Sequence, residues 1–339
     1  CKALKSIKIP EGITTIEQSA FHSCLALEYV WLPTSLKSIG SSAFFGCTAL
    51  NHINIPLGVT TFGTTVFDES GTYQSPLVIY VDNNEYINKL PEIAYGSTKV
   101  SKAITNGGTF LMDTEFEANP LADPVKHANI FSGWYTSDDF QEGTEVTGST
   151  AVPNTTYYAK WTESTYSLSA SSLEFDPISY GTASEAKAVS IRGDGSICSV
   201  LSSNPNVFTA EIVEGQVLVS PADTLDAGTY RETIFITASD NATFFLPVSI
   251  TISKASASIG ISANPSALSG GGTVTLTVNK SGLPQNAAVS VSGYSGILDT
   301  GNGTYTVTLP NATADYTFTV QYQGDINHLP AGAECTVSV

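Results

Sequence analysis

The side chains able to perform acid–base, nucleophilic or metal chemistry are few and scattered in this sequence of 339 residues. Its four histidines are His22, His52, His127 and His328, and none pairs at the short spacing of a zinc site or of an H-E-x-x-H motif. No C-x-x-C pair, G-x-S-x-G nucleophile turn or phosphate-binding glycine loop occurs. The sequence therefore predicts neither an enzyme nor a cofactor or metal site.

Two acidic pairs offer oxygen atoms of the kind that calcium prefers. They are Asp138–Asp139 and Asp240–Asn241. Neither pair belongs to a spaced calcium-loop signature, and Asp and Asn are equally typical of solvated turns. We therefore expect turns at both places.

Trp134 and Trp161 are expected to be buried, because a small β-module needs large side chains in its core.

The amino-acid composition limits the kinds of secondary structure and of binding partner that can be expected. Hydrophobic residues make up 42% and charged residues 13% of the chain, and 14 basic against 31 acidic residues give a net charge of −17. Polar residues without charge favour strands and turns over long surface helices. So acidic a surface repels phosphate backbones, which excludes nucleic acid as the expected partner. No apolar run approaches the roughly 20 residues of a membrane helix, so no membrane insertion is expected in this stretch.

A repeat of 23 residues dominates the start of the chain. Each unit carries a Cys-x-Ala-Leu phrase, then two apolar residues that alternate with polar ones, then a proline. The phrases begin at Cys1, Cys24 and Cys47, and the alternating pairs are Ile7 and Ile9, Val30 and Leu32, and Ile53 and Ile55. A single unit cannot bury its own apolar face, whereas stacked units form a continuous core, so the repeat predicts a solenoid.

This repeat resembles the BspA-type (Treponema-type) leucine-rich repeat of bacterial surface proteins, over residues 1–100. The strand-like run from Leu77 to Asp82 and the helix-like run from Glu85 to Leu90 resemble the last strand and C-terminal cap of that family. The resemblance implies adhesion or host contact, with a protein or a glycan of a host or bacterial surface as partner.

The repeat also predicts a surface. If Ile7 and Ile9 point inward, strand alternation turns the intervening residues outward. Stacking then forms two outward columns that contain Lys8, Tyr29, Trp31, His52, Asn54 and Tyr80. Exposed aromatic rings stack on sugars and peptides and are favoured at binding hot spots. Two alternatives to a binding role stay open: β-propensity alone placed the aromatic residues on this strand face, or a neighbouring module packs there.

Three further modules are expected after residue 100. Phe131-Ser-Gly-Trp-Tyr135 and Tyr157-Tyr-Ala-Lys-Trp161 resemble the Listeria–Bacteroides repeat, a small β-grasp-like module, over 101–163. Alternating runs separated by turn clusters over 164–254 and 255–339 are typical of β-sandwiches and resemble bacterial Ig-like domains. The linkers at 164–166 and 254–256 are short, which limits bending. The expected fold class is therefore mainly β and multidomain.

The five cysteines are expected to be unpaired. Cys1, Cys24 and Cys47 hold equivalent places on neighbouring coils, about 4.8 Å apart by strand spacing, but equivalent side chains point the same way, which is poor disulfide geometry. Cys1, Cys24 and Cys47 are therefore expected to form a ladder of buried free thiols. Cys198 and Cys335 are expected to be unpaired because each lies in a different domain. Because Cys1 already stands at a ladder position, we expect the chain to be an excerpt with further coils upstream.

The sequence thus predicts a monomeric piece of an extracellular, bacterial cell-surface protein. Adhesion or ligand binding is expected through the coils, with the other modules as a stalk. The alternative is a structural spacer whose binding head lies outside this stretch.

Overall fold

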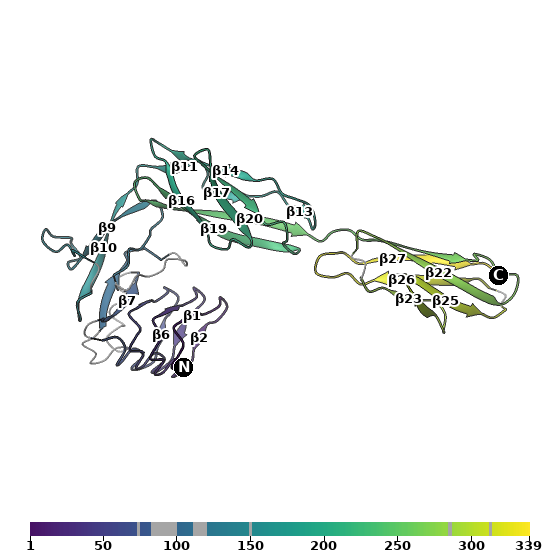
Figure 1. Cartoon of the computed structure of the whole chain (residues 1–339), viewed down its shortest axis with the longest axis horizontal. Helices are drawn as coiled ribbons and strands as arrows, with labels where there is room; N and C mark the ends of the chain where they lie inside the picture. Colours follow the sequence, from purple (N-terminus) through teal and green to yellow (C-terminus); the bar gives the residue numbers. More distant parts are fainter. Residues whose placement is uncertain (73–74, 83–99, 111–120, 149–150, 284–286, 312–313) are drawn as a thin grey trace.

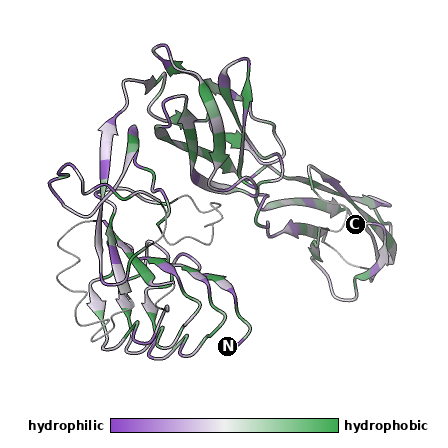
Figure 2. Cartoon of the chain, turned by 60° about the vertical axis from the view of Figure 1, so that its left-hand side comes forward, coloured by the Kyte–Doolittle hydropathy of each residue, from purple (hydrophilic) through white to green (hydrophobic). Residues whose placement is uncertain are grey.

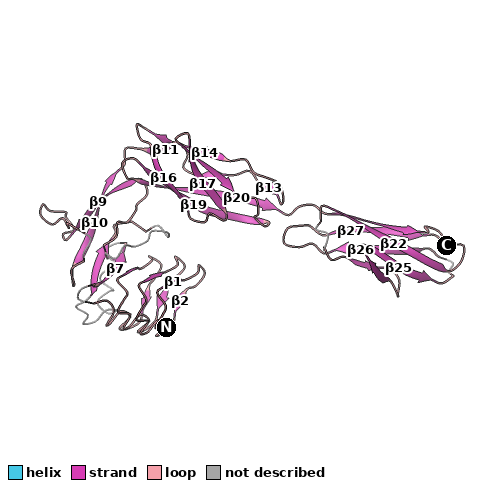
Figure 3. Cartoon of the chain, in the orientation of Figure 1, coloured by secondary structure: helices cyan, strands magenta, loops and turns pink. Residues whose placement is uncertain are grey.

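The computed structural model describes residues 1–72, 75–82, 100–110, 121–148, 151–283, 287–311 and 314–339 (Figure 1). Every regular element in these ranges is a β-strand, and the strands form several separate sheets (Figure 3). The expectation of a mainly β chain is therefore confirmed.

Residues 1–82 form what we call the coil stack, in which equivalent residues of successive 23-residue units lie side by side. One column of short strands is parallel and aligns Ser6 with Tyr29 and Lys8 with Trp31. A second parallel column aligns Ile16, Ile39 and Phe62. The strands are β1 (Ser6–Lys8), β3 (Tyr29–Trp31) and β5 (His52–Asn54) in the first column, and β2 (Thr15–Ile16), β4 (Ser38–Ile39) and β6 (Thr61–Phe62) in the second.

A ladder of phenylalanines fills the coil stack. Phe44 is fully buried between Phe21 and Phe67, with ring centroids 5.2 Å and 5.5 Å away and nearly parallel planes. One phenylalanine from each of three coils therefore contributes to a continuous row of rings. Gly63 is needed where the coils approach closely, since a Cβ there would lie 2.1 Å from the backbone nitrogen of Ser41.

All five cysteines are free, as predicted. Cys24 and Cys47 are buried, and the Cys47 thiol donates to the Phe21 carbonyl oxygen at 3.1 Å. Burial raises the pKa of Cys47 to about 11. The expected burial of Cys1 is wrong: its side chain is exposed, since no coil covers it in this structure.

Thiol titration tests this assignment. The unfolded, unreduced chain should show five reactive thiols, and a count of three or one would contradict it. In the native protein only Cys1 and Cys198, both exposed, should react quickly, because the reactive species is the thiolate and burial disfavours it.

The last short strand of the first column, β5, begins a five-stranded sheet that continues into the next part of the chain. β7 (Leu77–Val81) pairs in parallel with β5, β8 (Val100–Ile104) with β7, and β10 (Thr156–Glu163) with β8, while β9 (Asn129–Tyr135) closes the sheet antiparallel to β10. Ile104 is fully buried in the core of the coil stack. The sheet therefore crosses the boundary expected at residue 100. The cap expected at 85–90 lies outside the described residues.

Residues 100–163, which we call the second module, have a core of their own on the other face of this sheet. Trp134 is buried, as predicted, and Trp161 is half-buried, with its indole N–H donating to the Thr105 carbonyl oxygen at 2.8 Å. Phe110, Tyr157 and Tyr80 belong to the same core. Because Tyr80 comes from β7, this core joins the second module to the coil stack.

Residues 164–254 share one apolar core and form two main sheets, ordered β12-β20-β19-β16 and β14-β18-β17. Hydrophobic residues recur along the strands of this unit (Figure 2). The Tyr230 hydroxyl donates to the Asp226 carbonyl oxygen at 2.9 Å, across the turn before the longest hairpin. The strands are β11 (Ser167–Leu168), β12 (Leu173–Glu174), β13 (Ile178–Ser179), β14 (Lys187–Val189), β15 (Ile191–Arg192), β16 (Ile197–Ser202), β17 (Phe208–Val213), β18 (Gln216–Pro221), β19 (Gly228–Ala238) and β20 (Thr243–Ser253). We call this unit the first sandwich.

Residues 255–339 repeat the two-sheet plan, with orders β21-β22-β25-β24 and β23-β26-β27. Phe318 and Leu276, one from each sheet, are fully buried in a shared core. The strands are β21 (Ser258–Asn264), β22 (Gly272–Ser281), β23 (Ser290–Ser292), β24 (Leu298–Gly301), β25 (Thr304–Leu309), β26 (Tyr316–Tyr322) and β27 (Ala331–Val337). We call this unit the second sandwich.

Candidate functional site

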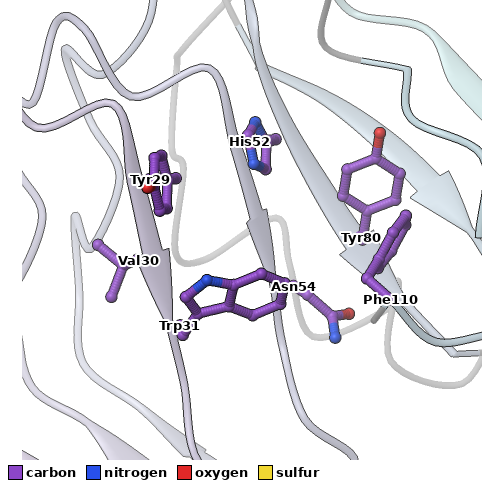
Figure 4. Close-up of a pocket in the computed structure, with 7 residues that line it drawn as sticks. All are labelled: Tyr29, Val30, Trp31, His52, Asn54, Tyr80 and Phe110. Carbon is purple, nitrogen blue, oxygen red and sulfur yellow. The ribbon is translucent and has the colours of Figure 1, made fainter. Parts of the chain in front are cut away.

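Five of the six residues expected to form a binding surface meet at one place. Tyr29 and Trp31 lie on β3, His52 and Asn54 on β5, and Tyr80 on β7, where they line one small pocket together with Val30 and Phe110 (Figure 4). The sixth, Lys8, is exposed on β1, directly opposite Trp31 in the strand register. We call these six predicted residues the aromatic face.

The expectation that the whole row is exposed is wrong. Tyr80 is fully buried and His52 is 5% exposed. The second module covers this end of the face: the Phe110 ring meets Tyr80 edge-on at 4.6 Å, and the Ala122 backbone N–H donates to the Tyr80 hydroxyl at 2.8 Å. Burial raises the pKa of Tyr80 above its usual range. For Tyr80, the alternative that a neighbouring module packs on the strand face is correct.

His52 is held as a buried, neutral ring. Its Nδ1 lies 2.5 Å from the Asn51 side-chain oxygen, and its ring stacks on Tyr29 at 6.3 Å with an interplanar angle of 9°. Burial lowers the pKa of His52 to about 4. The imidazole is therefore uncharged near pH 7 and acts as a flat support for the Tyr29 ring.

The accessible part of the aromatic face is smaller than expected. Tyr29, Trp31 and Asn54 are half-buried, and Lys8 is exposed. Trp31 packs partly against the core of the second module. The pocket between these residues has a volume of about 10 Å³, which is room for about one water molecule. A ligand would therefore rest on this surface and could not enter it.

Phe110 is the residue of this site that the sequence analysis missed. Phe110 follows the turn at Gly107–Gly108. The two glycines indicate that the chain turns there, but they do not indicate which strand the Phe110 ring will pack against. Only the parallel pairing of β8 with β7 brings Phe110 over Tyr80.

The acidic pairs behave as turn residues. Asp139 accepts hydrogen bonds from the Ser137 hydroxyl and the Gln141 amide of its own turn. Asp240 accepts from the backbone N–H of Ala242 at 2.9 Å. In the described ranges no three His, Cys, Asp or Glu side chains are grouped so that they could hold a metal ion.

Similar solved structures share little with this chain. A fragment of protocadherin gamma B7 with extracellular cadherin domains 1–4 is 14% identical, with 55% of this chain and 54% of that chain covered and a TM-score of 0.23. The N-terminal four Ig domains of Dscam1 isoform 6.9 are 14% identical, with 57% of this chain and 51% of that chain covered and a TM-score of 0.24. An endo-fucoidan hydrolase of glycoside hydrolase family 107 is 14% identical, with 51% of this chain and 34% of that chain covered and a TM-score of 0.22. The chain thus spans about half or less of their length, and these scores establish no common fold.

Sequence comparison gives a sharper result for the first part of the chain. No curated protein matches. None of the described residues forms a helix long and apolar enough to cross a membrane. Residues 1–90 match the family model of the BspA type leucine rich repeat region, in six copies.

Proposed function

We propose that this chain is part of an extracellular bacterial surface protein that binds a surface protein or glycan through its coil stack. The accessible part of the aromatic face carries the proposal: half-buried Tyr29 and Trp31, with Lys8 and Asn54 beside them, on a row of parallel strands. Large rings fixed by packing give contact area at low entropic cost, and indole and phenol rings are favoured at hot spots. Repeats of the matched type are known from surface adhesion proteins, which agrees with this role.

The charge distribution supports binding at this end. The coil stack, residues 1–82, carries four lysines against four glutamates and two aspartates, a net charge of −2, whereas the whole chain has a net charge of −17. The coils therefore repel an anionic surface much less than the remainder does. Nucleic acid remains an unsuitable partner for so acidic a chain, and we propose a monomer without enzymatic activity.

The architecture we propose follows from the same observations. Residues 1–100 are a leucine-rich-repeat solenoid, 101–163 a β-grasp-like module, and 164–254 and 255–339 two Ig-like sandwiches. The hydrogen bond from Tyr230 to the backbone four residues upstream is a feature of Ig-like sandwiches. The second module also completes the solenoid, because Ile104 lies in the core of the coil stack.

A structural spacer remains the second candidate. The observation in its favour is that the second module covers Tyr80, that His52 is also buried, and that only part of the aromatic face is accessible. A spacer would need no accessible rings on the coils, so the two candidates differ in what Trp31 does.

Replacing Trp31 with alanine tests the binding proposal. Glycan and protein arrays probed with the purified chain would supply the ligand, and we expect Trp31→Ala to weaken its binding by about tenfold or more, or about 1.4 kcal/mol. The control is His22→Ala, which removes an exposed ring from another edge of the same coils. Full affinity of Trp31→Ala for the ligand would favour the spacer.

A further inference from the structure

The contact between the two sandwiches is formed by residues of both units. The chain passes from β20 to β21 through residues 254–257 (Figure 1). A loop of the second sandwich, residues 323–330 between β26 and β27, turns back onto this crossing segment. The Ala255 N–H donates to the Asn327 carbonyl oxygen at 2.8 Å, and the Leu329 N–H donates to the Ala255 carbonyl oxygen at 2.9 Å. The connection is therefore paired with the loop like a short strand.

Asn327 links this loop to the first sandwich. Its side-chain oxygen accepts from the Ala227 backbone N–H at 2.8 Å, and its side-chain nitrogen donates to an Asp226 carboxylate oxygen at 2.8 Å. Asn327 is 9% exposed. The side-chain amide of Asn327 is planar, with the acceptor oxygen and the donor nitrogen in fixed positions. Its two hydrogen bonds to neighbouring residues therefore fix both the distance and the orientation of the loop relative to the first sandwich.

The loop is shaped before it meets the first sandwich. The Asp325 side chain accepts from the backbone N–H groups of Asn327 and His328, each at 2.7 Å, and from the His328 ring at 2.9 Å. The His328 ring then meets Tyr180 of the first sandwich edge-on at 5.4 Å. Asp325 thus presents Asn327 and His328 in the positions that the first sandwich contacts.

We propose that Asn327 is a latch that holds the two sandwiches in one fixed relative orientation. Domains that share only a small interface usually move relative to one another. Here, bending at 254–257 would separate Asn327 from Asp226 and Ala227, His328 from Tyr180, and Lys254 from the Asp325 carbonyl oxygen. These contacts share one short loop and must break together, so the joint opens as a unit.

The latch gives the pair of sandwiches a definite length. A rigid pair holds whatever the chain carries at one end at a constant distance from its other end, which a freely bending pair cannot do. This inference stands apart from the proposed binding role of the coils, because it depends only on contacts between residues 164–254 and 255–339.

Distance measurement between spin labels on the whole chain tests the latch. One label goes on Cys198, exposed on the first sandwich, and the other on Leu298→Cys, at a position 66% exposed on the second. Cys1→Ser and Cys335→Ala remove the other reachable thiols. We expect one narrow distance distribution, and Asn327→Ala should broaden it roughly twofold or more as independent domain motion returns.

Two further variants make the outcome decisive. Asn302→Ala, which changes an exposed asparagine of the same sandwich, should leave the distribution narrow. Asp226→Ala removes one of the two partners of Asn327 in the first sandwich and leaves the second sandwich intact. It decides the matter if Asn327→Ala perturbs folding in a thermal melt. A broad distribution in the parent chain, or narrow ones in both Asn327→Ala and Asp226→Ala, would overturn the latch.

Discussion

Replacing Phe44 with alanine should lower the free energy of unfolding of the coil stack by roughly 3–5 kcal/mol. The ring is fully buried and stacks on Phe21 on one side and Phe67 on the other. Its removal takes a large apolar surface out of the core and leaves a cavity in the middle of a ladder that joins three coils. The neighbouring rings cannot close this cavity, because backbone hydrogen bonds between the coils fix their spacing, as from Phe21 N–H to the Ala43 carbonyl oxygen.

The adjacent residue supplies the control. Phe45 is half-buried at the surface and stacks on His22, with ring centroids 5.0 Å apart. Phe45→Ala should therefore cost much less, about 1 kcal/mol or below. Urea unfolding followed by far-ultraviolet circular dichroism measures both. Equal losses for Phe44→Ala and Phe45→Ala would show that the ladder is not the core of the stack.

Acid should weaken the fold through His52. Burial lowers the pKa of this imidazole to about 4, against about 6.5 in an unfolded chain. The neutral imidazole makes its full contribution to the free energy of unfolding above pH 6.5. This contribution is lost as the pH falls from 6.5 towards 4, because between these pH values the unfolded chain binds the proton and the folded chain does not. The difference in pKa corresponds to a total loss of about 3 kcal/mol, of which about 2 kcal/mol falls between pH 7.5 and pH 5.

A phenylalanine at position 52 isolates this effect. His52→Phe keeps a flat ring on Tyr29 and cannot titrate, so its unfolding free energy should fall by about 2 kcal/mol less than that of the parent between pH 7.5 and pH 5. The lower pH stays above the pI of 4.4. His22→Phe, which keeps His52, should follow the parent. If parent and His52→Phe lose the same stability over this range, His52 is not the buried base described here.

Features that repeat along the sequence could be predicted from it. The spacing of 23 residues determines which side chains stack, so the inward-facing Ile53 and the unpaired state of Cys24 and Cys47 follow from the period. Alternation within each short strand likewise indicates that Tyr29 and Trp31 share one face. These predictions succeed because each coil repeats the environment of the one before.

Contacts made once, between parts of the chain without a common period, could not be predicted. The pairing of β8 with β7 carries the sheet past residue 100 and brings Phe110 and Ala122 onto Tyr80. The same register that predicts an exposed column therefore gives a buried Tyr80. The joint at Asn327 is of this kind too: its partners lie 100 and 101 residues away, and nothing in the local sequence marks them.

Hydroxyl-radical footprinting of the whole chain tests the central claim, that the coils bind and the sandwiches serve as a stalk. The chain is compared alone and with the strongest ligand from the arrays. We predict that binding protects Tyr29 and Trp31 from oxidation and leaves Tyr294 and Tyr316 of the second sandwich unchanged. Protection confined to residues 164–339, with Tyr29 and Trp31 oxidised as before, would contradict the claim.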